Sequence, residues 1–275
     1  MIARVALLTA ALWALCLPGF AQEDREAQLR RLYEALDMSG TIAIMDEEGD
    51  LYGAQIAEEM LPDADADAWA ATVARIYSPE RMQKLVEDEM AAALGQEDIA
   101  PILAFFEAEL GERIVALELA ARKAFLDPEV EEAAKARAEA AKARGDPVMD
   151  LVDTLIADSD LVELNVAGGL NSNLMFYRGL ADGGALDLGE EDILRDVWAQ
   201  EEESRADTQA WLRAFLLLAY DPLTLEELDA YAAFYRTDAG RALNAALFRS
   251  YNRMYDQLSY LLGQAVAQHV TSAPL

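Results

Sequence analysis

Apolar residues recur along this chain at spacings of three and four, and they almost nowhere alternate with polar residues. A spacing of three and four places side chains on one face of an α-helix, whereas a half-buried strand shows a period of two. Residues of high helix propensity dominate, and no segment combines alternation with β-branched enrichment. The pattern therefore predicts an all-α protein.

Several predicted helix starts carry a residue that can cap them. Ser78, Asp127 and Asp146 each precede a proline, and proline is favoured at the first helical position because its missing N–H would be unpaired there anyway. Thr224 and Glu227 have the spacing of a capping box, in which the two side chains satisfy free amides of the first turn.

Two parts of the chain repeat one pattern. Residues 94–111 align with residues 223–240 at a constant offset of 129, and residues 32–36 align with residues 151–155 at an offset of 119. Glycine-rich sequence around Asp182 accounts for the difference between the two offsets. A tandem duplicated helical bundle follows from this alignment.

The duplication defines the expected organisation of the chain. Helical unit 1 comprises residues 22–126 and helical unit 2 comprises residues 147–275. Residues 127–146 between them are rich in alanine and charge, with Glu131 and Lys135 four residues apart. Such a pair stabilises a helix surface, so we predict a solvent-exposed connector helix.

One motif of unit 2 resembles a known family. The residues are Glu226-Glu-Leu, then Phe234-Tyr-Arg-Thr, then Gly240-Arg-Ala-Leu. They resemble a bacterial family of exported helical proteins, domain of unknown function 2059 (DUF2059), best over residues 223–268 and more weakly over the repeat at 94–126. The resemblance implies an exported helical protein, and it supplies no catalytic residue because the family has no established activity.

The first 21 residues predict a signal peptide. Arg4 precedes an uncharged apolar run from Val5 to Leu17, which is too short to span a bilayer stably. Pro18 ends the run, and Gly19 and Ala21 are the small residues of a cleavage site. We expect cleavage after Ala21, a periplasmic location and no stable membrane anchor afterwards.

Cys16 leaves an alternative open, because a lipoprotein carries its lipid on an N-terminal cysteine. That reaction needs a small residue before the cysteine, where this chain has Leu15. If Cys16, the single cysteine, leaves with the signal peptide, the mature chain has no thiol. Disulfides and thiolate metal sites are then excluded together.

The charge of the chain restricts its partners. It carries 51 acidic and 22 basic residues, a formal net charge of −29. Loss of Arg4 leaves 21 basic residues, and the charge becomes −30. This field repels phosphates, so we expect no nucleic acid partner. It either solvates the surface or attracts a basic partner.

Most catalytic patterns are missing from the sequence. His269 is the single histidine, six residues from the end, so histidine-based catalysis and multi-histidine zinc sites have little support. No Walker loop, dinucleotide fingerprint or Gly-x-Ser-x-Gly elbow occurs. We expect no cofactor and assign no catalytic residue.

An aspartate cluster imitates the start of a calcium loop, at Asp63, Asp65 and Asp67. The EF-hand pattern then requires glycine and glutamate, where this chain has Ala68 and Ala74. A helix N-terminus explains the aspartates equally well, since it favours negative charge. We assign no metal ligand.

Small residues suggest where two helices meet. At the offset of 119, Gly49 matches Gly168 and Gly53 matches Ser172. A small-x3-small spacing lets another helix approach closely, and a pseudo-two-fold axis would bring matching positions together. We predict that the first long helices of the two units cross here, around residues 42–60 and 161–180.

Polar residues beside this predicted crossing are the candidate binding residues: Asp46, Asn165, Asn171, Ser172 and Asn173. Asp46 matches Asn165 one turn before the small residues, and Asn171, Ser172 and Asn173 interrupt an otherwise apolar run. Polar groups in such surroundings need a partner, water or a ligand. The alternatives are hydrogen bonds satisfied inside the protein, a small binding cleft, and a docking surface for a partner.

These observations favour a non-catalytic binding or envelope-assembly module, whose partner is an unknown envelope protein or a small ligand. A carboxylate-dependent hydrolase or lyase, with or without a divalent cation, is the alternative from another class. A calcium-dependent structural module is the third. The oligomeric state is left open.

The signal peptide predicts the N-terminus of the mature protein. Mass spectrometry of the exported protein should find Gln22 as its first residue, because signal peptidases cleave after small residues. A lipid-modified Cys16 at the N-terminus would instead establish the lipoprotein alternative.

Overall fold

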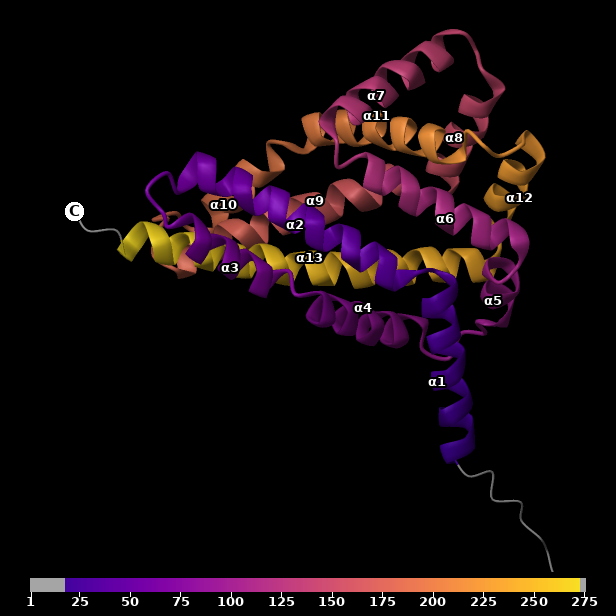
Figure 1. The fold of residues 1–275 in the computed structure, drawn as a ribbon, viewed down its shortest axis with the longest axis horizontal. Coiled ribbons are helices and arrows are strands. Elements are labelled where there is room, and N and C mark those ends of the chain that lie inside the picture. The colour runs from indigo at the N-terminus through magenta and orange to yellow at the C-terminus, as the bar shows by residue number, and fades with distance from the viewer. Residues whose placement is uncertain (1–17, 273–275) are drawn as a thin grey trace, which may run out of the picture.

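The computed structural model describes residues 18–272, and every regular element within that range is an α-helix (Figure 1). The all-α prediction is confirmed. Residues 1–17, with most of the predicted signal peptide and Cys16, lie outside the described residues. The helices are α1 (Pro18–Ala35), α2 (Met38–Met60), α3 (Ala66–Ile76), α4 (Pro79–Leu94), α5 (Ala100–Phe106), α6 (Glu109–Ala124), α7 (Pro128–Ala143), α8 (Pro147–Asp158), α9 (Leu161–Asp182), α10 (Glu190–Trp198), α11 (Glu201–Tyr220), α12 (Leu225–Tyr235) and α13 (Asp238–Ser272).

The helix starts follow the capping residues. Asp127 and Asp146 accept hydrogen bonds from amides of the first turn, at 2.9 Å and 3.2 Å, and cap α7 and α8. Thr224 and Glu227 form the predicted capping box of α12. Ser78 precedes α4 as predicted, although its hydroxyl donates to a Glu80 carboxylate oxygen rather than capping the backbone.

The longest helix, α13, packs against both halves of the molecule (yellow in Figure 1). It runs beside α9 of the second half, and it also contacts α4, α3 and α5 of the first half. Met254, Leu258 and Leu262 are at most 2% exposed. One hydrophobic core therefore contains residues of both predicted units.

Two aromatic pairs between α5 and α12 also join the two halves. The rings of Phe105 and Phe234 stack with their centroids 4.4 Å apart, and Phe106 meets Phe234 edge-on at 5.4 Å. Phe105 and Phe234 are equivalent at the offset of 129. Equivalent residues thus meet at this aromatic contact, as expected near a pseudo-two-fold axis.

The glycines that follow these aromatic pairs have the same surroundings. Gly111 lies in the first turn of α6 and Gly240 in the first turn of α13. A Cβ at either position would strike the backbone carbonyl oxygen of Phe105 or Phe234, and would come within 2.6 Å of the Cα of the next residue. Only glycine permits this tight turn between two helices.

The helix bounds indicate that residues 127–146 belong to a repeated helix rather than to a connector. Together α6 and α7 span residues 109–143, and the offset of 129 carries these bounds onto 238–272, the bounds of α13. Pro128 stands at the break between α6 and α7, and proline inside a helix removes a hydrogen bond and clashes with the preceding turn. We interpret α7 as the second half of a repeated long helix that Pro128 interrupts.

The prediction that residues 127–146 are exposed to solvent is wrong for one face of α7. The predicted pair forms, with Lys135 Nζ 2.6 Å from a Glu131 oxygen. However, Ala134, Ala138 and Ala141 are buried on the face that α7 packs against α11. A methyl group every third or fourth residue allows close helix packing, so alanine here fits an interface rather than solvent.

The starts of α2 and α9 favour a different alignment offset from the one taken from the sequence. Both helices begin after an aspartate in the left-handed conformation, Asp37 with φ 42° and Asp160 with φ 50°. These two residues are 123 positions apart, four more than the offset taken from the sequence. A shift of one helical turn returns apolar residues to the same face, so hydrophobicity alone does not distinguish the two offsets. The duplication itself stays a prediction, which these shared features support.

Glycine substitutions test the shared turn. Gly111→Ala and Gly240→Ala should each lower the free energy of unfolding by about 1–3 kcal/mol, because the new methyl group meets backbone that cannot move aside. Gly169→Ala is the control, since it lies within α9 with no atom within 4 Å of the added Cβ. It should raise stability by about 0.5–1 kcal/mol. Urea unfolding gives all three values, and equal stability of the three variants would contradict the assignment.

Candidate functional site

The predicted crossing of α2 and α9 is wrong, because the glycines of each helix face side chains from the same half of the molecule. Gly49 faces the ring of Tyr77 and Gly53 faces Val73, both from the α3 segment. Gly168 faces Asn252 of α13. Accordingly α2 packs against α3, α4 and α6, while α9 packs against α13, α11 and α10.

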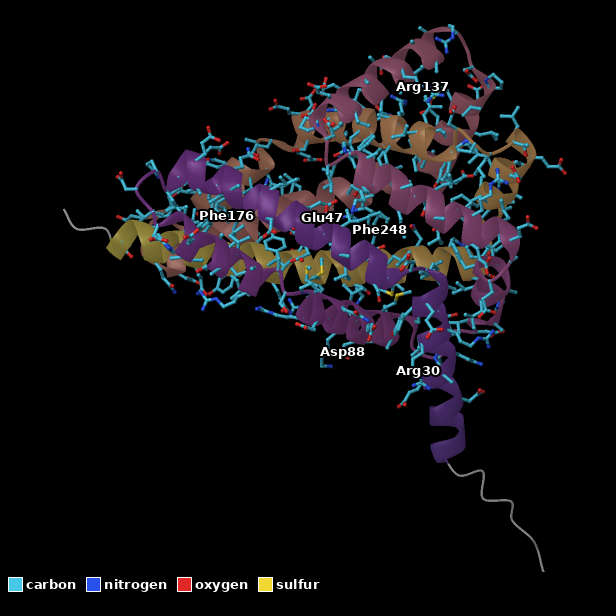
Figure 2. All side chains as sticks on the ribbon, in the orientation of Figure 1. Arg30, Glu47, Asp88, Arg137, Phe176 and Phe248 are labelled. Atoms are coloured by element: carbon cyan, nitrogen blue, oxygen red, sulfur yellow. The ribbon has the colours of Figure 1, made fainter. Side chains whose placement is uncertain are left out.

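A cleft of about 690 Å³ opens where the two helices face each other without packing. Its floor and walls come from five helices and the C-cap of α3, around Phe248 of α13, which is labelled in Figure 2. The lining residues come from α2 (Met45, Glu48, Gly49, Tyr52), the α3 C-cap (Tyr77), α6 (Arg122), α9 (Asn165, Gly168, Gly169, Ser172, Asn173), α11 (Trp211, Phe215) and α13 (Leu247, Phe248, Tyr251, Asn252, Tyr255, Ser259).

The five candidate residues separate into two groups. Asn165, Ser172 and Asn173 line the cleft, whereas Asp46 and Asn171 do not. Asn171 lies on the exposed side of α9. Burial raises the pKa of the Asp46 carboxyl, and the nearby charges of Asp50 and Glu47 raise it further. That these residues bind a ligand stays a prediction.

The charged groups of the cleft neutralise each other. Arg122 donates from Nε and Nη2 to the two carboxylate oxygens of Glu48, at 2.8 Å and 2.7 Å, and from Nη2 to the Tyr255 hydroxyl at 3.2 Å. Burial lowers the pKa of Arg122, but the bonds to Glu48 and Tyr255 outweigh it and hold the guanidinium charged. This pairing of Glu48 and Arg122 is bidentate, the strongest form of such an ion pair.

Aromatic rings form most of the remaining wall. Trp211 and Phe215 stack with centroids 5.0 Å apart and planes 5° from parallel. Tyr52 is 43% exposed at the α2 side. Burial raises the pKa of Tyr251 to about 12, so its phenol stays neutral at ordinary pH. The wall therefore offers apolar faces and neutral hydroxyl groups.

Free polar groups lie between these rings. Ser172, Asn173, Asn252 and Ser259 make no side-chain hydrogen bond within residues 18–272. Asn165 uses its amide N–H on the carbonyl oxygen of Leu161, at 2.7 Å, which leaves its carbonyl oxygen as an acceptor. An amide offers donors and acceptors together, so the cleft can meet either kind of group on a ligand.

Three further residues line the cleft although no sequence pattern indicated them: Arg122, Trp211 and Tyr255. Each stands in an ordinary amphipathic helix, and Arg122 is 74 residues from its partner Glu48 and 133 from Tyr255. A local sequence pattern cannot indicate contacts between residues so far apart along the chain. A charged residue on the apolar side of α6 was the one signal available.

A second buried polar cluster lies away from the cleft. The hydroxyls of Tyr220 and Tyr231 both donate to Oε1 of Glu118, at 2.6 Å and 2.8 Å. Burial raises the pKa of Glu118 above its ordinary value, although the two hydrogen bonds lower it in part. Because Glu118 is in α6 and the tyrosines are in α11 and α12, the cluster links the two halves.

The candidate metal and histidine positions have structural roles here. Asp65 accepts a hydrogen bond from the Ala68 amide at 2.8 Å and caps α3. His269 lies edge-on to Trp69, with centroids 5.2 Å apart, inside α13 rather than in a loose terminus. Across residues 18–272, no three histidine, cysteine, aspartate or glutamate side chains are placed to hold a metal ion.

The fold defines an all-α protein, and comparison with known families adds one match. The family described as an uncharacterized protein conserved in bacteria, DUF2059, matches residues 80–140. This is the family that the sequence resembles, but the match covers α4 to α7 rather than the motif in residues 223–268. Residues 127–140 of the segment predicted as a connector therefore lie within the matched region.

Two other comparisons are negative. No curated protein and no solved structure matches the chain. Within the described part of the chain, no helix has the length and apolar character needed to cross a membrane.

The Glu118 cluster generates a pH prediction. A raised folded-state pKa contributes stability that is complete below the unfolded pKa, about 4.3 for glutamate, and is lost as pH rises through the folded value. Glu118→Gln keeps the Oε1 acceptor and removes the charge. Its melting temperature at pH 7 should exceed that of the wild type by at least about 2 °C, the effect of roughly 1 kcal/mol in a protein of this size.

The difference should shrink as the pH falls below about 4.3, where glutamate becomes protonated in the unfolded state as well. Glu112→Gln, on the exposed side of the same helix, is the control for overall charge. A Glu118→Gln variant less stable than the wild type at pH 7 would contradict the prediction.

Proposed function

We propose that this protein is an exported, non-catalytic binding module of the bacterial cell envelope, and that its ligand occupies the cleft between α2 and α9. The observation that carries the proposal is the composition of the cleft. Its charges are paired with each other, while four amide or hydroxyl side chains have no partner within the described residues. A cleft of about 690 Å³ also falls in the usual range of ligand pockets, roughly 300–1,000 Å³.

The paired charges also favour binding over catalysis. A carboxylate-dependent hydrolase needs two carboxyl groups facing one cleft, one to donate a proton and one to activate water or attack. Glu48 is the single carboxylate among the lining residues, and both of its oxygens accept from Arg122. Withdrawing it for acid–base chemistry would leave the partly buried guanidinium of Arg122 unpaired, which costs free energy.

Export rests on the sequence of the first 21 residues and on the resemblance to an exported family. The bacterial description of the matched family agrees with that location. A net charge of −29 keeps such a protein soluble and away from anionic lipid headgroups.

Two tryptophan variants on one helix test the cleft. Gly169→Trp should block it, because Gly169 lines the cleft and its added Cβ meets no atom within 4 Å, and thermal unfolding should check that the variant folds. Asn171→Trp is the matched control, two residues on, exposed and outside the cleft. Ligand-observed NMR with a small-molecule extract of the bacterial envelope should show binding to wild type and control, weakened at least tenfold in Gly169→Trp.

Equal binding by the two variants would place the site elsewhere. Conversion of the bound compound into products during the measurement would favour the hydrolase or lyase alternative.

A further inference from the structure

The cleft continues into a second hollow. That hollow, of about 590 Å³, lies between α7, α9 and α11 and shares two lining residues, Asn165 and Trp211, with the cleft. Its other lining residues are Glu131, Lys135, Asp207, Thr208 and Ala210. The two hollows together suit an elongated ligand that passes the Asn165–Trp211 boundary.

The charges along this path exclude most ionic ligands. Arg122 is held by Glu48, and Lys135 is held by Glu131 and Glu132, at 2.6 Å and 3.0 Å. No lining cation is therefore left for an anionic ligand, and the net charge of −29 repels one. Asp207 is the one lining carboxylate that makes no ion pair within the described residues, and it lies in the second hollow alone. The part of the ligand in the cleft is neutral.

Rings and polar groups alternate along the cleft. On α13, Tyr251, Tyr255 and Ser259 follow one another at steps of one helical turn, with Asn252 beside them. Ser172 and Asn173 face them from α9. A ligand that matches this wall has flat apolar faces for the rings and many hydroxyl groups at its edges for the amides.

We propose that the cleft and the adjoining hollow bind a neutral oligosaccharide, with Trp211 as a stacking surface between two subsites. A sugar ring presents apolar C–H faces to aromatic rings and hydroxyls that both donate and accept. A hydrocarbon chain would instead leave the serine and asparagine groups desolvated without partners, which costs free energy. This inference rests on the proposed function, since it names the ligand class of the same cleft.

The test is calorimetric titration of the full mature chain with three neutral series: β-1,4-glucose, α-1,4-glucose and β-1,4-N-acetylglucosamine oligomers. At least one hexasaccharide should bind, at least tenfold more tightly than the disaccharide of its series. Gly169→Trp should weaken both lengths at least tenfold, and Asn171→Trp should weaken neither. Thr208→Trp, in the second hollow, should weaken the hexasaccharide and leave the disaccharide unchanged.

Two further probes separate the failure of this inference from the failure of the proposed function. Proline-rich peptides also bind aromatic grooves, so a proline decapeptide is titrated in parallel, together with oleate. If no sugar series binds but peptide or oleate does, in a manner lost in Gly169→Trp, the oligosaccharide is overturned and the binding cleft stands. If a hexasaccharide binds but Gly169→Trp and Asn171→Trp behave alike, the assignment to this cleft is overturned. If no probe and no envelope extract binds, both proposals fall.

Discussion

The structure depends on α13 burying apolar residues on more than one side. A helix with so wide an apolar surface cannot be covered by one layer of partners. Here α9 covers one side, and α4, α3 and α5 of the other half cover another. The two halves therefore share one core, and neither half alone could shield the apolar side chains of α13 from solvent. That shared burial links the stability of the halves.

The cleft is a consequence of how the neighbours of α13 reach it. Glycines allow Tyr77 to approach α2 and Asn252 to approach α9 closely, so each long helix packs within its own half. The space left between them is filled neither by a helix crossing nor by apolar side chains. Arg122 and Glu48 hold its α2 side through a bidentate ion pair that also reaches Tyr255 of α13. One ion pair and one hydrogen bond thus connect α2, α6 and α13 beside the opening.

A single proline makes the two halves differ. Pro128 interrupts α6–α7 in the first half, whereas α13 continues straight past the corresponding position, Gln257. The freed segment α7 folds back onto α11 and buries three alanines there. This return places Glu131 and Lys135 beside Trp211 and forms the second hollow. The break between α6 and α7 at Pro128 therefore shapes the candidate site.

The sequence by itself determined the fold class and the helix ends, because these depend on local chemistry. Spacing of apolar residues is visible along the chain, and Asp127, Asp146 and Thr224 cap the helices they precede through amides one turn away. Three of the candidate residues named from the sequence line the cleft: Ser172 and Asn173, which interrupt apolar sequence, and Asn165, which matches Asp46.

Tertiary structure alone decided the partners of the glycines and the ion pair of Arg122 with Glu48, and it favours an offset of 123 between the starts of α2 and α9. A shift of one helical turn preserves the apolar face, so sequence periodicity could not choose between offsets of 119 and 123. A glycine permits a close approach but does not specify which helix makes it. The partly buried ion pair joins residues 74 apart, and only the packing of whole helices brings them within 2.7 Å.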